Sequence, residues 1–268
     1  MSEFKSVMKK ELKRIKDYDK KLPIVEVYTA VQSEGSRAGY PTVVVRTTGC
    51  THRCFFGEGG WCDSWYTSVH PDKGGYSMND VIAAYDNNPH ISEMMLTGGS
   101  PTMHPALVNE MTIFAKERGI FITMETEGSH YVETQYPIDL LSISPKFKNS
   151  VPVLGTLTPL GKVTDEKMIK KHNSKRLNLE AIKKQIAFHK DYHIKPVWDG
   201  ADMDTLEEIL SVIKELNAPE DKVWFMPAGG AREELFQSYP KVFDWVRDNG
   251  YRMTWRAHII AFEDQREV

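Results

Sequence analysis

The sequence predicts an α/β protein with a mostly parallel sheet, in the form of a partial (β/α) barrel of about six strand–helix units. Short apolar runs alternate along the chain with segments whose apolar residues repeat at helical spacing, and this alternation is typical of parallel sheets. Polar and glycine-rich motifs follow several of the runs. Such motifs are expected at the carboxyl ends of barrel strands, where the active sites of these folds lie.

The strands and helices are predicted from these patterns in chain order. The eight predicted strands are Pro23–Thr29, Pro41–Thr47, Ile91–Thr97, Ile120–Glu125, Ile138–Ser144, Ile194–Trp198, Val223–Pro227 and Tyr251–Trp255. Ser77 and Asp80 form a capping-box signature ahead of one helix. Pro105 near the start of another helix and Gly119 just past its end follow the usual asymmetry of helix termini. The four predicted helices are Val81–Tyr85, His104–Gly119, Leu177–His189 and Thr205–Leu216.

Residues 1–22 are predicted to be a basic, helical N-terminal extension, and residues 23–268 a single domain. The first 21 residues carry eight Lys or Arg against four Asp or Glu. Met8, Leu12 and Ile15 recur at helical spacing and give a thin apolar stripe. This pattern fits a solvated helix packed on the domain, or an arm that binds a partner or nucleic acid. Lys146–Lys175 is polar and poorly periodic, so we expect a long surface excursion there.

Composition bounds the class of protein and its compartment. A formal charge of −3 over 268 residues argues against nucleic-acid binding by bulk electrostatics, and no stable nucleic-acid complex is expected. No apolar run approaches the roughly 18–20 residues that span a bilayer, and the N-terminal stretch lacks the apolar segment of a secretory signal. The cysteine count is three. We therefore expect a cytoplasmic protein in a reducing compartment, with no membrane partner.

All three cysteines, Cys50, Cys54 and Cys62, lie on one glycine-rich loop directly after a predicted strand. A structural zinc site needs four ligands, and His52 or His70 could supply the fourth. A 4Fe–4S cluster with three cysteine ligands would instead leave one iron free to bind a substrate or cofactor. Spacing alone fits either site, and it also fits three cysteines that bind no metal.

Four further strand ends carry polar motifs: MLTGGSP (Met95–Pro101), METEGS (Met124–Ser129), SISPK (Ser142–Lys146) and WFMPAGG (Trp224–Gly230). Each motif taken alone is weak evidence for a functional site. A Gly-Gly pair at a strand end leaves the main chain uncovered, so a ligand can approach it closely. Four such ends on the same face of a barrel predict a ring of polar groups around the cysteine loop.

This order of motifs resembles that of the radical S-adenosylmethionine enzymes, which combine a three-cysteine loop with a Gly-Gly-x-Pro strand end. Upstream, VQSEGSRAGYPTVVVRTTGC (Val31–Cys50) is similar to the opening of the 7-carboxy-7-deazaguanine synthase family. Trp61–Tyr66, Ser144–Lys146, the MPAG strand end and a late segment with His258 resemble that family too. The matching residues in the opening are Gln32, Glu34, Gly35, Gly39, Arg46, Gly49 and Cys50.

The resemblance implies a 4Fe–4S cluster on the three cysteines, with S-adenosylmethionine bound at the open iron. The reduced cluster would cleave the sulfonium and yield a 5′-deoxyadenosyl radical. No side chain is expected to act as a catalyst, because the protein positions groups and excludes water while the cofactor carries the chemistry. The residues implied to hold S-adenosylmethionine are Thr97, Gly98, Gly99, Ser100, Glu125, Thr126, Ser144, Lys146, Met226 and Pro227.

The implied reaction is that of a carbon–nitrogen lyase. It contracts 6-carboxy-5,6,7,8-tetrahydropterin to 7-carboxy-7-deazaguanine, with loss of ammonia, on the route to queuosine-type 7-deazapurines. The implied substrate-binding residues are Gln32, Glu34, Gly35, Arg46 and His258, and Ser64 is the implied Mg²⁺ ligand. An external electron donor such as flavodoxin and a homodimer are also implied.

The sequence departs from the family pattern at several places. Seven residues, Phe55–Trp61, separate the last two cysteines, where the compact form has two. Ser64 replaces a threonine, Ser100 replaces the acidic residue of Gly-Gly-Glu-Pro, and Glu127 stands where asparagine is frequent. Two other functions fit parts of the pattern: an activase that generates a glycyl radical on a protein, and a zinc-stabilised binding module.

Overall fold

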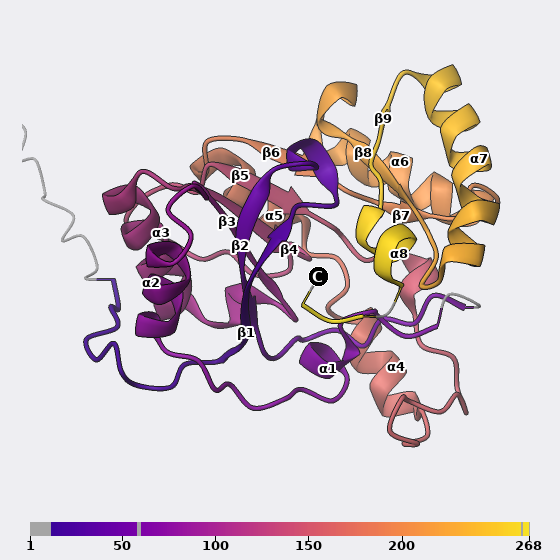
Figure 1. Cartoon of the computed structure of the whole chain (residues 1–268). Helices are drawn as coiled ribbons and strands as arrows, with labels where there is room; N and C mark the ends of the chain where they lie inside the picture. The colour runs from indigo at the N-terminus through magenta and orange to yellow at the C-terminus, as the bar shows by residue number, and fades with distance from the viewer. Residues whose placement is uncertain (1–11, 58–59, 264, 268) are drawn as a thin grey trace, which may run out of the picture.

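The structure is a computed structural model that describes residues 12–57, 60–263 and 265–267 (Figure 1). Its main sheet has six strands in the order β1-β2-β3-β4-β5-β6, and a second sheet has the order β7-β8-β9. An isolated parallel bridge between Ile194 and Val223 connects the two sheets. The strands are β1 (Ile24–Val31), β2 (Pro41–Thr47), β3 (Glu93–Gly98), β4 (Phe121–Thr126), β5 (Leu140–Ile143), β6 (Tyr192–Ile194), β7 (Val197–Trp198), β8 (Trp224–Pro227) and β9 (Arg252–Met253).

From β2 to β9 the paired strands are parallel, which confirms the predicted partial (β/α) barrel. Two details differ from the prediction. The first strand, β1, pairs antiparallel with β2. The predicted strand Ile194–Trp198 is divided between β6 and β7 at Pro196, because proline has no amide proton to donate to a ladder.

Helices cover the outer side of the sheets. The longer ones are α2 (Met78–Asp86), α3 (Pro105–Arg118), α5 (Leu179–Phe188), α6 (Met203–Leu216) and α7 (Arg232–Asn249). The shorter ones are α1 (Trp65–Ser68), α4 (Glu166–Asn173) and α8 (Ala257–Phe262), with 3₁₀ turns at Gly35–Arg37, Pro101–Met103, Lys148–Ser150 and Glu220–Lys222. All four predicted helices are present, and the capping box of Ser77 and Asp80 is formed. No helix among these described segments is both long and apolar enough to cross a membrane.

The alternation of side chains along β2 places one of the predicted site residues. Val43 and Val45 belong to the hydrophobic core under the helices. Because successive side chains of a strand point to opposite faces, Arg46 shares the other face with Val44. Arg46 therefore points into the barrel rather than into the core.

The prediction of a helical N-terminal extension is wrong for the part that the structure describes. Met8 lies outside the described residues, and residues 12–22 contain no helix. The buried carboxylate of Glu110 on α3 binds this segment in a non-helical conformation. It accepts hydrogen bonds from Arg14 Nη2 at 2.8 Å, Tyr18 Oη at 2.6 Å and the Ile15 amide at 3.2 Å.

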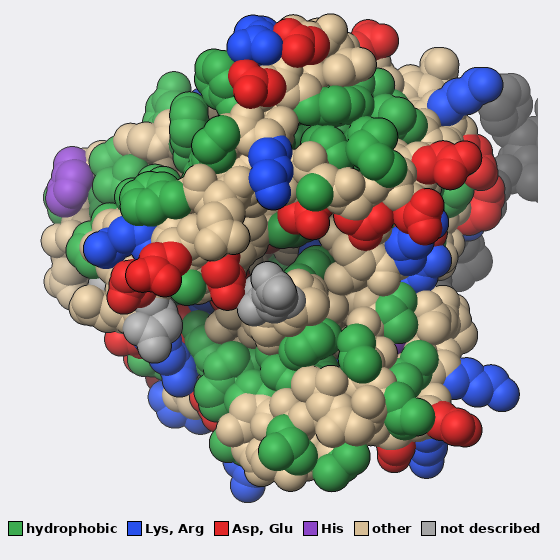
Figure 2. All heavy atoms as spheres, turned by 90° about the vertical axis from the view of Figure 1, so that its right-hand side faces the viewer, with side chains coloured by type: hydrophobic (Ala, Val, Ile, Leu, Met, Phe, Trp, Pro, Cys, Tyr) green, Lys and Arg blue, Asp and Glu red, His purple; other side chains and the backbone are tan. Residues whose placement is uncertain are grey.

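The excursion Lys146–Lys175 has more structure than its polar sequence predicts. It contains helix α4, which Asp165 caps by accepting a 2.7 Å hydrogen bond from the Met168 amide, and an isolated bridge between Leu157 and Val163. Figure 2 shows one side of the molecule, where hydrophobic side chains gather in an upper and a lower region with charged side chains between them. The exposed apolar side chains of the excursion are Val153, Leu154, Leu157, Leu160 and Val163.

Candidate active site

The enlarged cysteine loop folds as a small hairpin that brings two cysteines together. Phe55 and Trp61 form an antiparallel bridge, and their rings meet edge to face with centroids 5.2 Å apart. At the base of the hairpin, the Cys62 amide donates a 3.1 Å hydrogen bond to the Cys54 carbonyl. The seven residues between them therefore leave Cys54 and Cys62 as close neighbours.

The three thiols lie near one another in a largely buried site. Burial raises the pKa of Cys50 to about 12 and that of Cys62 to about 11, and it raises the pKa of Cys54 well above its usual range. Charge on Cys50 or Cys62 raises the pKa of Cys54 further, whereas the ammonium of Lys146 lowers the pKa of all three thiols. Thiolates here need a bound cation, and the iron of a cluster would supply one.

Two histidines, His52 on the cysteine loop and His172 on the excursion, bind these two segments together. His172, from α4, is fully buried; its Nδ1 accepts a 3.1 Å hydrogen bond from the Arg53 amide, and its Nε2 lies 3.1 Å from Ser150 Oγ. His52 Nε2 donates to the Lys175 carbonyl at 3.0 Å. Burial lowers the pKa of His172 to about 3 and that of His52 to about 4, so both are neutral at pH 7. Nothing in the lysine-rich sequence of α4 indicated the role of His172.

The two histidines considered as zinc ligands have other contacts. His70 Nε2 lies 2.8 Å from Thr158 Oγ1. His52 Nδ1 lies 3.1 Å from Thr51 Oγ1 and 4.0 Å from Cys50 Sγ. Within residues 12–57, 60–263 and 265–267, no group of three or more His, Cys, Asp and Glu side chains is placed to hold a metal ion.

Gly98 and Gly99 pack the end of β3 against the start of the cysteine loop. A Cβ on Gly99 would overlap the carbonyl oxygens of Gly49 and Thr67, and one on Gly98 would overlap the backbone of Thr47. The Gly99 amide also donates to the Thr47 carbonyl at 3.0 Å. The sequence predicted that these glycines let a ligand approach. Instead, protein backbone fills the space that their side chains would occupy.

The ends of β4 and β5 place the other predicted cofactor residues on one side of the thiols. Lys146 Nζ donates to Ser144 Oγ at 2.9 Å, and the Ser144 amide donates to the Thr126 carbonyl at 2.7 Å. The Thr126 hydroxyl accepts from the Gly128 amide at 3.1 Å. Thr97 is tied to β2, because its carbonyl accepts a 3.2 Å hydrogen bond from Thr47 Oγ1.

Met226 and Pro227 lie farther round the barrel, on β8. The Met226 amide donates to the Pro196 carbonyl at 2.8 Å, and its side chain is buried.

Glu34 is the centre of an ionic cluster that the sequence did not reveal. Lys195 Nζ lies 2.6 Å from Glu34 Oε2 and 2.7 Å from Glu125 Oε2. Arg256 Nε lies 3.3 Å from Glu34 Oε1, and His258 Nε2 lies 3.9 Å from the same oxygen. Burial alone would raise the pKa of Glu34, but its neighbours, chiefly the cations Lys195 and Arg256, lower it to about 2.

Lys195 and Arg256 carry the positive charge of this cluster, and both are buried. The guanidinium of Arg256 also binds the Asp63 carboxylate, beside Cys62, and the Gly229 carbonyl. One signal could have indicated Arg256, since it stands two residues before His258 in the segment that resembles the family. Lys195 lay within a predicted strand and had no such signal.

Arg46 is the centre of a second polar cluster in the barrel. Its Nε donates to Glu26 Oε2 at 2.6 Å, its Nη2 to Tyr28 Oη at 3.0 Å and its Nη1 to Ser64 Oγ at 3.3 Å. Ser64 Oγ in turn lies 3.3 Å from Asp63 Oδ1. Arg46 and Ser64, the predicted substrate and Mg²⁺ residues, are therefore adjacent, and part of the Arg46 fork is already paired with a carboxylate.

The loop after β1 joins the two edges of the barrel. The Gly35 amide donates to Thr254 Oγ1, and the Ala257 amide donates to the Ser33 carbonyl at 3.3 Å. Gly35 has a φ of +69°, and a Cβ there would lie 2.6 Å from the His193 ring, so no larger residue fits. Gln32 does not join the Glu34 cluster, because its buried amide donates to Glu93 Oε2 at 3.3 Å.

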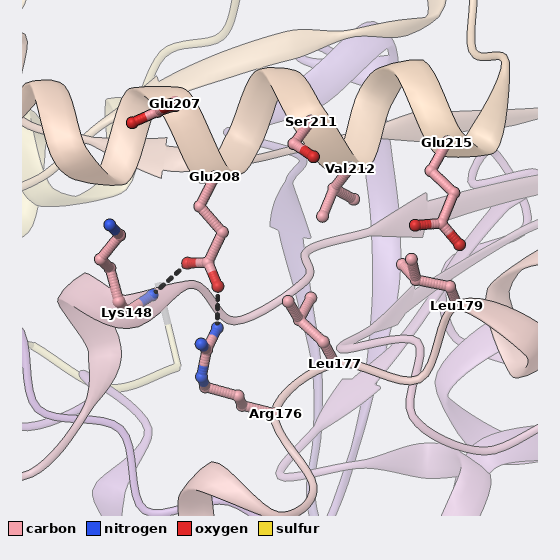
Figure 3. A pocket seen from close by; sticks show the side chains of 9 residues that line it. All are labelled: Lys148, Arg176, Leu177, Leu179, Glu207, Glu208, Ser211, Val212 and Glu215. Atoms are coloured by element: carbon pink, nitrogen blue, oxygen red, sulfur yellow. Dashed lines mark hydrogen bonds and ion pairs between the residues drawn. The ribbon is translucent and has the colours of Figure 1, made fainter.

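Two cavities lie away from the cysteines. One, of about 570 Å³, has a mostly apolar lining that includes Gln32, Trp255 and His258. The other, of about 620 Å³, lies between α6 and the segment before α5 (Figure 3). Its central carboxylate, Glu208, is paired with Arg176 at 2.7 Å and accepts from the Lys148 amide at 2.7 Å.

Comparison with known proteins places these features in a family. No protein-family model matches the chain. A 7-carboxy-7-deazaguanine synthase of Halobacterium salinarum is 34% identical over 251 residues, covering 92% of this chain and 93% of the relative. One of Rhodopirellula baltica is 30% identical over 245 residues, covering 91% and 88%. The crystal structure of QueE from Escherichia coli covers 87% of this chain and 93% of its own, with a TM-score of 0.54 at 18% identity. This last likeness concerns the fold alone.

Proposed function

The chain belongs to the 7-carboxy-7-deazaguanine synthase family of the radical S-adenosylmethionine superfamily, and we propose that it contracts 6-carboxy-5,6,7,8-tetrahydropterin to 7-carboxy-7-deazaguanine and ammonia. The observation that carries the proposal is the match to two synthases over about nine-tenths of the chain. It confirms the resemblance found in the sequence. Both relatives are synthases, so family membership favours ring contraction over glycyl-radical activation.

The chemistry of the donor set fits the cofactors that the family implies. The thiols are near enough to one another to influence each other's pKa, and the ammonium of Lys146 and the buried carboxylate of Glu127 influence the pKa of Cys50 and Cys54 as well. When bound, a 4Fe–4S cluster with S-adenosylmethionine supplies one-electron chemistry and hydrogen-atom abstraction from C6 of the pterin. The residues of this chain bind and orient: Cys50, Cys54 and Cys62 hold the cluster, and Lys146 and Ser144 bind the methionine carboxylate.

The pterin is proposed to lie between the two polar clusters. Glu34 accepts hydrogen bonds from the amino-pyrimidinone edge, and Lys195 and Arg256 keep it ionised at every pH near neutrality. Arg46 and His258 face the substrate carboxylate from β2 and α8. Gln32 and Gly35 support the shape of this site. Gln32 donates a hydrogen bond to Glu93, and Gly35 packs closely against the His193 ring.

Mg²⁺ is proposed at Ser64. The hydroxyl of Ser64 and the nearby carboxylate of Asp63 are oxygen ligands of the kind that Mg²⁺ prefers. The guanidinium of Arg46, 3.3 Å from the same hydroxyl, opposes a cation there. We therefore propose a weak site, at which substrate oxygens complete the coordination of the ion.

An external electron donor is proposed to dock beside the cysteine hairpin. Trp61 Nε1 donates a 2.9 Å hydrogen bond to the Leu157 carbonyl, so the exposed apolar side chains of the excursion stand next to the loop that holds the cluster. A flavodoxin-type donor in the cytoplasm fits this surface. A homodimer is proposed from family membership, and its test is the mass of the protein in solution by light scattering.

An anaerobic assay tests the proposed reaction. Reconstituted protein, given S-adenosylmethionine, a reductant and the carboxytetrahydropterin, is expected to release 7-carboxy-7-deazaguanine, and Cys54→Ala is expected to abolish turnover. Arg46→Lys is expected to lower turnover, because lysine cannot keep the contacts of a planar fork. Parallel assays with Mg²⁺ and with EDTA, on the wild type and on Ser64→Ala, test the metal. Turnover that persists in Cys54→Ala would contradict the cluster assignment.

A further inference from the structure

Glu127 has a buried carboxylate oxygen with no partner. The residue directly follows β4, and its side chain is 3% exposed. Its Oε1 accepts hydrogen bonds from Ser100 Oγ at 2.9 Å and from Ser129 Oγ, and it lies 3.6 Å from His130 Nδ1. Its Oε2 has no hydrogen-bond partner among the residues that the structure describes.

This orphaned oxygen differs in kind from the other buried polar atoms without partners. Those of the described segments are two threonine hydroxyls and one glutamine carbonyl, all of them neutral. Glu127 is ionised, because hydrogen bonds from His130 and Ser129 lower its pKa to about 2 despite its burial. Leaving a charged oxygen unpaired in a buried site costs much more than leaving a hydroxyl unpaired. The oxygen is therefore placed to receive a donor that the chain itself does not supply.

Glu127 lies near two of the three thiols, those of Cys50 and Cys54. Ser100, its hydrogen-bond partner, is fixed to the cysteine loop by the 2.8 Å hydrogen bond from its amide to the Gly49 carbonyl, next to Cys50. The negative charge of Glu127 raises the pKa of both Cys50 and Cys54. A ligand bound on these thiols would therefore lie near the carboxylate of Glu127.

The charges around the thiols match those of an amino acid. Glu127 places a carboxylate beside them, and Lys146 places an ammonium beside them. An α-amino group and an α-carboxylate sit on one carbon, and the methionine moiety of S-adenosylmethionine carries both. A sulfonium has no N–H to donate, so the amino group is the part of that molecule that can satisfy Oε2.

We propose that Glu127 Oε2 accepts the α-ammonium of S-adenosylmethionine, so that this chain supplies from the end of β4 the carboxylate that the Gly-Gly-Ser-Pro strand end lacks at Ser100. Ser100 then acts as a positioning residue, because its hydroxyl holds the other oxygen of the same carboxylate. The inference rests on the proposed cofactor. It adds the residue that recognises one group of that cofactor.

Binding measurements on the anaerobically reconstituted holoenzyme test the proposal. Two probes are used: S-adenosylmethionine, and 5′-methylthioadenosine, which has the same adenosine and sulfur but no amino acid. Glu127→Gln keeps an oxygen for Ser100 and Ser129 and removes the charge. It is expected to weaken S-adenosylmethionine binding by about 10- to 100-fold, the usual effect of losing a hydrogen bond to a charged group. Binding of 5′-methylthioadenosine is expected to change less than about twofold, because that probe has no ammonium.

A matched control is Glu133→Gln, which removes an exposed carboxylate six residues farther on and is expected to bind both probes as the wild type does. If Glu127→Gln does not fold, Ser100→Ala serves instead. That substitution leaves the carboxylate charged but less well held, and it is expected to weaken S-adenosylmethionine alone, by about threefold to tenfold.

Three results would overturn the proposal. If Glu127→Gln bound S-adenosylmethionine as tightly as the wild type does, the proposed contact would not exist. Equal weakening of both probes would show that Glu127 acts on the shape of the pocket. If the reduced cluster of Glu127→Gln, without any added ligand, gave an EPR signal different from that of the wild type, Oε2 would be a ligand of the iron. Wild-type protein that binds neither probe would overturn the inference together with the cofactor assignment, whereas the first three results would leave that assignment standing.

Discussion

Lys195 Nζ lies 2.6 Å from Glu34 Oε2, although the two residues are 161 positions apart in the chain. The same ammonium lies 2.7 Å from Glu125 Oε2. Lys195 itself stands between β6 and β7, next to Pro196, which interrupts the strand. One buried cation therefore neutralises two carboxylates, one from the loop after β1 and one from β4.

Lys195→Met is expected to destabilise the protein by about 3 kcal/mol. Removing one partner of a buried ion pair costs about 3–5 kcal/mol, and the lower end applies because both carboxylates keep some contact with solvent. Thermal unfolding of the reconstituted protein measures the loss. Lys183→Met, which removes a lysine paired at the surface, is the control and is expected to change stability by less than about 0.5 kcal/mol. Equal melting temperatures for the two variants would contradict the role of Lys195.

His172→Ala is expected to lower both iron content and stability. The substitution leaves the Arg53 amide and Ser150 Oγ without their partner, at about 1–3 kcal/mol for each buried group that stays unsatisfied. Because Arg53 precedes Cys54, the loop then holds its thiols less firmly. Iron and sulfide analysis after anaerobic reconstitution, together with thermal unfolding, checks this expectation. The exposed His90→Ala is the control. A wild-type iron content in His172→Ala would show that α4 does not hold the loop.

Gly99→Ala is expected to cost about 3 kcal/mol or more and to reduce cluster content by more than about half. The new methyl group would overlap the Gly49 and Thr67 carbonyls, which are backbone atoms and cannot turn away, so the cost lies at or above the upper end for overpacking. Gly75→Ala is the matched control, because no atom lies within 4 Å of a Cβ at that position. Iron content and thermal unfolding measure both variants. Wild-type behaviour of Gly99→Ala would mean that β3 does not support the cysteine loop as described.

The contact of Glu110 with the N-terminal segment predicts a pH dependence of stability. Burial alone would raise the pKa of Glu110, but hydrogen bonds from Arg14, Tyr18 and the Ile15 amide lower it. The unfolded chain, with a glutamate pKa of about 4.3, then binds the proton more readily than the folded protein does. This contribution to stability is therefore present above pH 4.3 and is lost as the pH falls through the lowered pKa.

Urea unfolding at pH 7, 5 and 4 measures this effect. The wild type is expected to lose stability towards pH 4 more steeply than Glu110→Gln, which has no proton to bind at that position. Glu117→Gln, an exposed residue on the same helix, is expected to follow the wild type. Parallel pH profiles for the wild type and Glu110→Gln would exclude Glu110 as the cause.

Much of the fold could be predicted because its signals are local. The capping box of Ser77, the Pro105 and Gly119 signals of α3 and the alternation of apolar runs each depend on residues within one or two turns. The antiparallel direction of β1 has no local signal, since a strand of the same composition can pair either way. The N-terminal segment had a helical pattern, but the tertiary contact of Arg14 and Tyr18 with Glu110 prevailed over it.

The sequence by itself determined the alternation of strands and helices in a parallel α/β fold, the family and the three-cysteine loop, because each depends on residues that are close together along the chain. Only the tertiary structure decided that Lys195 and Arg256 surround Glu34, that His172 holds the loop and that Glu127 lies near Cys50 and Cys54 with an unpartnered oxygen. These contacts join segments as much as 222 positions apart. Spacing along a chain carries no information about such pairs until packing brings them together.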